Sequence, residues 1–185
     1  MSSKPKAKLY TRYPWSSILI YNGATVLHFA LGGLGIILGL SFAPLASQAL
    51  AIVYLVFAFG EMYWLMPLVV CPNCVYVRRA DGRCISGMNV VSRRIARIGD
   101  VNQLSKRAEG MLCPNNLYLV SLLAPILITL VTLPINFSWG LALVAVVLIG
   151  LLLFRFFVIF PKLACLHCAA KFHCPQAAMM GVREL

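Results

Sequence analysis

Four long apolar segments dominate the chain, at residues 16–42, 45–70, 117–134 and 137–160. A helix needs about 20 mostly apolar residues to cross the hydrocarbon core of a bilayer. Each segment is close to that length or above it, and charged or turn-forming residues separate the segments. The pattern therefore predicts an all-α integral membrane protein whose four transmembrane helices pair as two hairpins.

The composition excludes a soluble globular domain. Hydrophobic residues make up 61% of the chain and charged residues only 11%, whereas ordinary globular proteins are about 45–50% apolar and about 25% charged. So few charges cannot cover the surface of a water-soluble protein of this size, which supports the membrane interpretation.

The basic residues predict the orientation. They precede the first segment, fill the connection between the second and third, and follow the fourth, while the turns near Pro44 and Asn136 carry no charge. By the positive-inside rule we expect a multi-pass protein of the inner (cytoplasmic) membrane with both termini in the cytoplasm. The net charge of +11 then reflects contact with anionic lipid headgroups, and no nucleic-acid partner is expected.

This topology divides the chain into five parts. We expect a basic N-terminus at 1–15, a first hairpin at 16–70, a cytoplasmic cysteine-containing loop at 71–116, a second hairpin at 117–160 and a cysteine-rich tail at 161–185. The loop and the tail together would form a cytoplasmic cap.

Within the loop, one segment has helical periodicity. Met88, Val91, Ile95 and Ile98 recur at the spacing of one helix face, and Ser86 is a suitable cap. We predict an amphipathic helix from Ser86 to Ile98 that lies on the membrane surface or docks a partner protein.

Glycines in the first apolar segment predict a close helix contact. Gly35 and Gly39 are four residues apart, which places them on one face of a helix. Small residues at this spacing let a second transmembrane helix approach closely. The sequence does not say which helix that is.

Both hairpins end in the same motif, Pro-x-x-x-Cys-x-x-Cys: Pro67, Cys71 and Cys74 in the first, and Pro161, Cys165 and Cys168 in the second. The two copies are 94 residues apart. Either coincidence or an old duplication explains them, and a duplication would give a pseudo-twofold axis along the membrane normal.

All seven cysteines fall on the side expected to be cytoplasmic: Cys71, Cys74, Cys84, Cys113, Cys165, Cys168 and Cys174. The cytoplasm keeps thiols reduced, so structural disulfides are not expected. Metal binding or catalytic thiol chemistry is the better interpretation of such a group.

Two groupings of metal ligands fit the spacing, because two CxxC turns supply a tetrahedral set. A shared site would use Cys71, Cys74, Cys165 and Cys168. Separate local sites would use Cys71, Cys74, Cys84 and Cys113 in the loop, and Cys165, Cys168 and Cys174 in the tail with His167 or His173 as the fourth ligand.

The sequence favours an iron–sulfur cluster over zinc, and either over metal-free thiols. Cys174-Pro175 ends a C-x₂-C-x₅-C-P run that partly matches the ligand pattern of bacterial ferredoxins, with one cysteine missing. The Cys-Pro-Asn-Cys turn at Cys71 and the nearby histidines are typical of zinc sites. Thiolates bind both metals.

Three ionisable residues fall inside the apolar segments: His28, Glu61 and Arg155. Ionisable groups in a bilayer are costly and often functional. We predict a quinone or proton site here, with a structural hydrogen-bonded set as the alternative. His28 and Glu61 would lie at similar depth and touch, while Arg155 would pair with Glu61 or snorkel. Haem is disfavoured because only one histidine lies within a span.

These features predict an integral membrane subunit of a redox complex, in which a cytoplasmic metal site links a soluble or peripheral electron-transfer partner to the quinone pool. The alternatives are a non-catalytic membrane anchor with a structural Cys₄ zinc site, and a four-span CxxC thiol oxidoreductase or soft-metal carrier. No motif of a known catalytic class occurs in the sequence, so whether the chain is an enzyme stays open.

Overall fold

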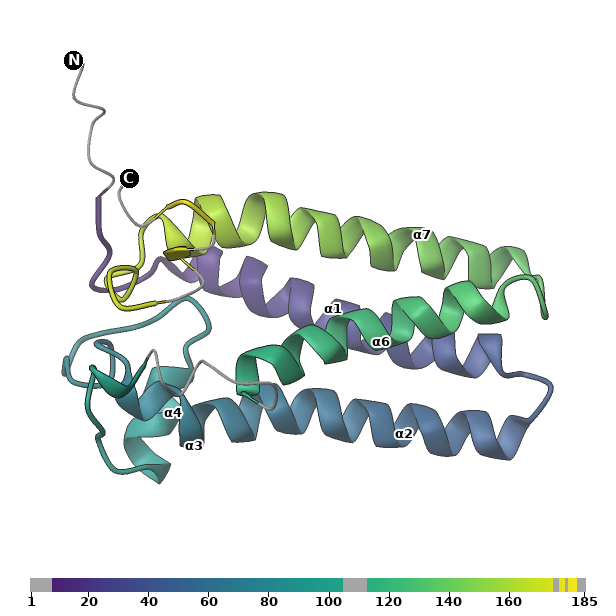
Figure 1. Cartoon of the computed structure of the whole chain (residues 1–185), viewed down its shortest axis with the longest axis horizontal. Coiled ribbons are helices and arrows are strands. Elements are labelled where there is room, and N and C mark those ends of the chain that lie inside the picture. The colour runs from purple at the N-terminus through teal and green to yellow at the C-terminus, as the bar shows by residue number, and fades with distance from the viewer. Residues whose placement is uncertain (1–7, 105–112, 175–176, 179, 183–185) are drawn as a thin grey trace, which may run out of the picture.

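All the regular secondary structure in the described part of the computed structural model is helical (Figure 1). The described residues are 8–104, 113–174, 177–178 and 180–182. Within these ranges no strand forms, and two isolated β-bridges are the extended pairings outside the helices. The prediction of an all-α fold is confirmed.

Four helices are long and apolar enough to cross a membrane: Trp15–Gly39, Pro44–Asn73, Pro114–Thr132 and Trp139–Cys165. Each contains most of one segment predicted from the hydrophobic pattern. Many of their large apolar side chains are exposed on the outside of the bundle, as expected for surfaces that face lipid. The chain thus has the features of a multi-pass membrane protein.

The first and third of these helices are α1 (Trp15–Gly39) and α6 (Pro114–Thr132), and the other two are composite. The second consists of α2 (Pro44–Gly60), the π-helical stretch η1 (Glu61–Leu65), α3 (Met66–Val69) and the 3₁₀ turn η2 (Cys71–Asn73). The fourth consists of α7 (Trp139–Phe154) and the π-helical stretch η3 (Arg155–Cys165).

The two π-helical stretches start at equivalent points of the two copies of the motif. Glu61 begins η1 and Arg155 begins η3, and each lies ten residues before the first cysteine of its CxxC. Pro67 and Pro161 follow each start by six residues. Proline lacks an N–H and clashes with the carbonyl four residues back, and a wider turn relieves both problems. This shared irregularity favours duplication over coincidence.

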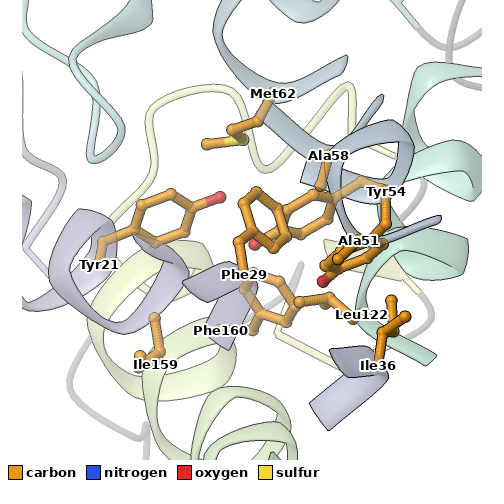
Figure 2. Close-up of a cluster of buried hydrophobic side chains, with 11 residues drawn as sticks. Tyr21, Phe29, Ile36, Ala51, Tyr54, Ala58, Met62, Leu122, Ile159 and Phe160 are labelled. Carbon is orange, nitrogen blue, oxygen red and sulfur yellow. The ribbon is translucent and has the colours of Figure 1, made fainter. Parts of the chain in front are cut away.

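Helix α1 is the centre of the bundle, where it packs against α2, α6 and α7. Its fully buried Phe29 and Ile36 meet Ala58 of α2 and Leu122 of α6 in the main core, and Figure 2 shows these side chains gathered around one centre. In Figure 1 the start of α1, helix α4 and the segment after η3 lie at one end of the bundle. The α1–α2 and α6–α7 connections lie at the other end.

The glycine spacing in α1 marks its contact with α6. A Cβ atom on Gly35 would lie 2.5 Å from Cγ2 of Thr129, and one on Gly39 would collide with Oγ1 of Thr132. The prediction of a close helix approach at these glycines is therefore confirmed, and the partner is α6.

We expect Gly35→Ala to destabilise the bundle, because its new methyl group must displace Thr129. Overpacking of this kind costs about 1–3 kcal/mol. Gly23→Ala is the matched control: Gly23 is in the same helix, but a Cβ atom there meets nothing within 4 Å. Unfolding in mixed micelles, followed by circular dichroism, checks the pair. Equal stability of the two variants would contradict the close contact.

The amphipathic helix of the loop forms, but it is shorter than predicted. Helix α4 covers Met88–Ile95 instead of reaching from Ser86 to Ile98. Gly87 has a left-handed φ of 75°, and Ala96 is extended, so the helix cannot continue at either end. Val91 and Ile95 are exposed, which leaves docking onto a membrane or a partner as a prediction.

Candidate functional site

Tyr76 holds the two CxxC segments side by side. It lies two residues after Cys74, and its hydroxyl oxygen accepts a hydrogen bond from the backbone N–H of Ala169, at 3.0 Å. The same hydroxyl donates to the carbonyl oxygen of Tyr10, at 2.7 Å. Because Ala169 follows Cys168 directly, this one buried side chain joins the two halves of the chain at their cysteines.

An extended segment before α1 lies between the same two regions. Tyr10 forms a parallel β-bridge with Cys168, and Arg12 forms one with Arg83. The N–H of Tyr10 donates to the carbonyl of His167 at 2.9 Å, and the N–H of Tyr13 donates to the carbonyl of Arg83 at 3.0 Å. Sequence reasoning missed this segment. The only local signal was two tyrosines in an otherwise basic stretch.

Thiols from both halves gather beside these contacts. Cys74, Cys84 and Cys168 pack against one small core. Cys74 also lies close enough to Cys84, Cys168 and Cys174 for these neighbours to raise its pKa, and Cys84 and Cys174 raise the pKa of Cys168 in the same way. We call these four residues, Cys74, Cys84, Cys168 and Cys174, the thiol cluster.

The first cysteine of each motif flanks this cluster. Cys71 interacts electrostatically with Cys74 and Cys84, and Cys165 interacts with Cys168 and Cys174. These interactions of Cys71 and Cys165 stay within each half of the chain, so the shared site and the local sites both remain predictions.

Two thiols of the cluster, those of Cys74 and Cys168, are neutral near pH 7. Burial, reinforced by the neighbouring thiols, raises the pKa of Cys74 to about 12 and that of Cys168 to about 11. The thiolate is the reactive form of cysteine, so these side chains are poor nucleophiles as they stand. They become thiolates only when something replaces their protons, as a metal ion does.

The thiols are near one another without forming a coordination shell. Within the described ranges, no three His, Cys, Asp or Glu side chains are placed so that they could hold a metal ion. Metal ligation by any of these residues, whether of zinc or of an iron–sulfur cluster, stays a prediction.

Two other predicted ligands have different surroundings. Cys113 is buried at the start of α6, where its sulfur accepts a hydrogen bond from the N–H of Asn116 at 3.4 Å, and it is not among the side chains packed with Cys74. His173 is exposed. The alternative histidine, His167, stacks on Tyr10 with ring centroids 4.6 Å apart. Ligation by Cys113, His167 or His173 therefore stays a prediction.

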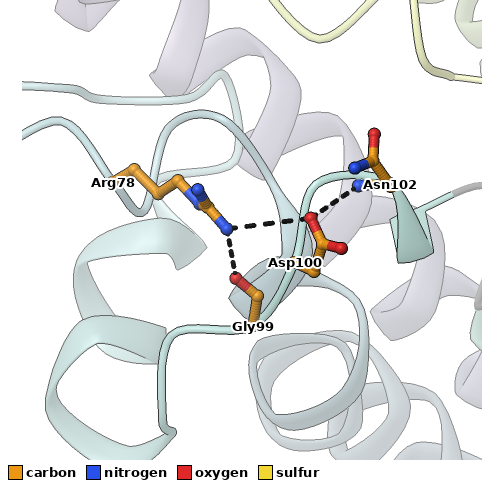
Figure 3. A network of polar contacts seen from close by, with 4 residues as sticks. All are labelled: Arg78, Gly99, Asp100 and Asn102. Carbon is orange, nitrogen blue, oxygen red and sulfur yellow. Dashed lines mark hydrogen bonds and ion pairs between the residues drawn. The ribbon is translucent and has the colours of Figure 1, made fainter.

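The cysteine-rich tail contains a buried lysine that sequence reasoning missed. Lys171 is 3% exposed although it lies between Cys168 and Cys174, and its ammonium donates to the carbonyl of Leu166 at 3.4 Å. In the described part of the chain the single ion pair joins Arg78 to Asp100 at 3.9 Å, on the exposed side of the loop (Figure 3). Lys171 is thus a buried basic side chain of the tail with no carboxylate partner among the described residues.

Arg155 is buried in the bundle and does not snorkel to the headgroups. Its guanidinium donates to Oγ1 of Thr25 at 3.0 Å and to the hydroxyl of Tyr118. It also lies 5.5–5.9 Å from the ring centres of Tyr21, Tyr118 and Phe160. Hydroxyl and aromatic groups therefore surround this cation in place of the carboxylate expected from Glu61.

Glu61 and His28 are buried as well, but they do not bond to each other. Nε2 of His28 lies 3.0 Å from the carbonyl oxygen of Leu122 on α6. Neither carboxyl oxygen of Glu61 has a hydrogen-bond partner among the described residues. Tyr118 interacts electrostatically with both Glu61 and Arg155, so this tyrosine connects the two ionisable groups.

We call His28, Glu61 and Arg155 the intramembrane group. Tyr21 approaches both this group and the thiol cluster. It interacts electrostatically with Tyr118 and Arg155 on one side and with Cys84 on the other. In Figure 2 its ring points from α1 toward the centre of the bundle. Tyr21 is therefore within electrostatic range of both candidate sites.

Comparisons with models of protein families, with curated proteins and with solved structures find no match for this chain.

Proposed function

We propose that the chain is an integral membrane subunit of a redox complex, and that its cysteine-bearing end holds a thiolate-ligated metal centre. An iron–sulfur cluster is favoured over zinc. The observation that carries the proposal is the direct contact of the two CxxC segments through Tyr76, which collects thiols from sequence positions far apart. A purely hydrophobic bundle would not require thiols to gather in this way.

The orientation and the pairing of the helices belong to this proposal. The four spans form two hairpins, with both termini and the cysteine-rich cap in the cytoplasm, because the basic residues are at that end. The cap then faces a reducing compartment, in which thiols persist and a soluble or peripheral electron-transfer partner can dock.

Charge supports a metal at the thiol cluster. A divalent ion or an iron–sulfur cluster held by four thiolates is a net anion. Lys171 supplies a buried cation with no carboxylate partner among the described residues. Burying an unpaired charge is expensive, so an anionic centre beside Lys171 would offset the cost of its burial.

The intramembrane group supports a quinone site within the bilayer, to which electrons would pass from the metal centre. Quinone reduction takes up electrons and protons in equal number. Electrons from the partner would pass through the metal centre and past Tyr21, and Glu61 would supply a proton beside Tyr118 and Arg155. The electrostatic interaction of Tyr21 with both Arg155 and Cys84 supports a pathway that joins the two sites.

Metal analysis with a visible spectrum, on protein purified without oxygen, tests the proposal. Iron with acid-labile sulfide and a broad absorbance is the expected result. Colourless protein with stoichiometric zinc would instead support the membrane anchor, whose specific support is the 3₁₀ turn at Cys71–Asn73. Metal-free protein whose thiols cycle with a quinone would support the thiol oxidoreductase and overturn the metal centre.

Glu61→Gln should slow quinone reduction by about 10²-fold or more, the usual contribution of a positioned proton donor. Its metal content should stay unchanged, since Glu61 is not a ligand. Reduction of a soluble quinone analogue by reduced methyl viologen measures the rate. Asp100→Asn, which changes an exposed carboxylate of the loop, is the control. Equal rates in both variants would show that Glu61 has a structural role and does not supply the proton.

A further inference from the structure

A polar cavity, separate from the thiol cluster, lies where the loop meets the segment before α1. Its volume is about 210 Å³, and its charged lining consists of Arg12, Arg83, Arg93 and a single carboxylate, that of Asp81. Three guanidinium groups around one small space create a strong preference for an anion.

The backbone around this cavity is held in place. The guanidinium of Arg93 donates to the carbonyls of Arg79 and Gly82, each at 2.9 Å, and to that of Ala80. The N–H of Arg83 donates to the carbonyl of Thr11 at 3.2 Å, next to Arg12. The arginines therefore surround the cavity on a fixed frame and not on a free loop.

Arg83 has an unused donor at this site. Its Nη1 atom is buried and has no hydrogen-bond partner among the described residues. The guanidinium lies 4.1 Å from the ring centre of Trp15, which fixes its plane. A buried guanidinium nitrogen without an acceptor is costly, so a turn of this side chain toward an anion in the cavity would be favourable.

The position of Trp15 identifies the source of the anion. Trp15 is the first residue of α1 and is 63% exposed, and exposed tryptophans at the ends of transmembrane helices mark the headgroup level of a bilayer. The cavity is therefore at the height of phospholipid phosphates. Arginine binds phosphate through paired, charge-assisted hydrogen bonds.

We propose that the Arg12–Arg83–Arg93 cavity binds the phosphate of an anionic phospholipid. The lipid would join the segment before α1 to the loop. Because Cys84 follows Arg83 directly, the bound headgroup would also steady one member of the thiol cluster. The proposal does not depend on a metal, so it can fail or succeed separately from the proposed function.

Native mass spectrometry of the full chain in detergent, titrated with phosphatidylglycerol, tests this site. Arg12→Gln should weaken binding about tenfold, the loss expected for one charge-assisted hydrogen bond, and Arg12 is exposed, so the variant should fold. Arg94→Gln removes an equal charge from an exposed position of α4 that does not line the cavity, and it should bind as the parent does. Arg83→Gln is a second variant with the same expected loss.

Three outcomes would overturn the proposal. Equal weakening by Arg12→Gln and Arg94→Gln would show general attraction between opposite charges. Equal binding of phosphatidylcholine would show that the site does not select an anionic lipid. Displacement of the lipid by millimolar inorganic phosphate, with retention of the phosphate ion, would identify a free phosphate as the ligand.

Discussion

Replacing Cys74 or Cys168 with serine should remove most of the metal from the purified protein and loosen the end of the bundle where the two CxxC segments meet. Each residue belongs to the thiol cluster, and each comes from a different half of the chain. Thiolate ligation contributes about 10–16 kcal/mol to the folding of small zinc domains, so the loss of one ligand should cost several kcal/mol. Metal analysis and hydrogen exchange of the loop backbone measure the two effects.

Cys113→Ser is the matched control for these variants. Cys113 is a buried cysteine of the same chain, but it caps α6, and serine is a good helix cap. This variant should keep both its metal and its stability. Full metal content in either Cys74→Ser or Cys168→Ser would rule out a site shared by the two halves. Loss of metal in Cys113→Ser would instead support the local site in the loop, in which Cys113 is a ligand.

Metal affinity should rise steeply with pH. The pKa values of about 12 for Cys74 and about 11 for Cys168 mean that both thiols are protonated near pH 7, so each must release a proton when it binds a metal. With these two ligands each releasing one proton, the apparent affinity should increase by up to about 10²-fold per pH unit. Zinc competition against a chelator at several pH values measures the slope.

The metal-free protein should respond to pH in the opposite direction. In the unfolded chain the thiols ionise near their ordinary pKa of about 8.5, whereas in the folded chain the pKa values of Cys74 and Cys168 are raised. Their contribution to stability is therefore complete below about pH 8.5, and it is lost as the pH rises toward the folded pKa values.

Cys168→Ser should reduce the number of protons released on metal binding by one, and with it the slope of metal affinity against pH. A metal affinity that does not change with pH would contradict thiolate ligation.

The intramembrane group shows which features of the candidate site could be predicted from the sequence and which could not. The sequence identified His28, Glu61 and Arg155 because an ionisable residue in an apolar segment is conspicuous by itself. It paired them with one another, however, since the partners that the structure provides are ordinary residues. Thr25, Tyr118 and the carbonyl of Leu122 carry no signal in a sequence until the packing of α1, α6 and η3 brings them together.

The sequence by itself determined the four spans, the two CxxC turns and the glycine face of α1. Each of these depends on residues close together in the chain, and lipid leaves a spanning segment no backbone structure other than a helix or a closed barrel. Only the tertiary structure decided which thiols gather, that Lys171 is buried, and that α6 is the helix facing Gly35. Those results depend on contacts between residues far apart in sequence, which arise when whole helices pack and which no local pattern encodes.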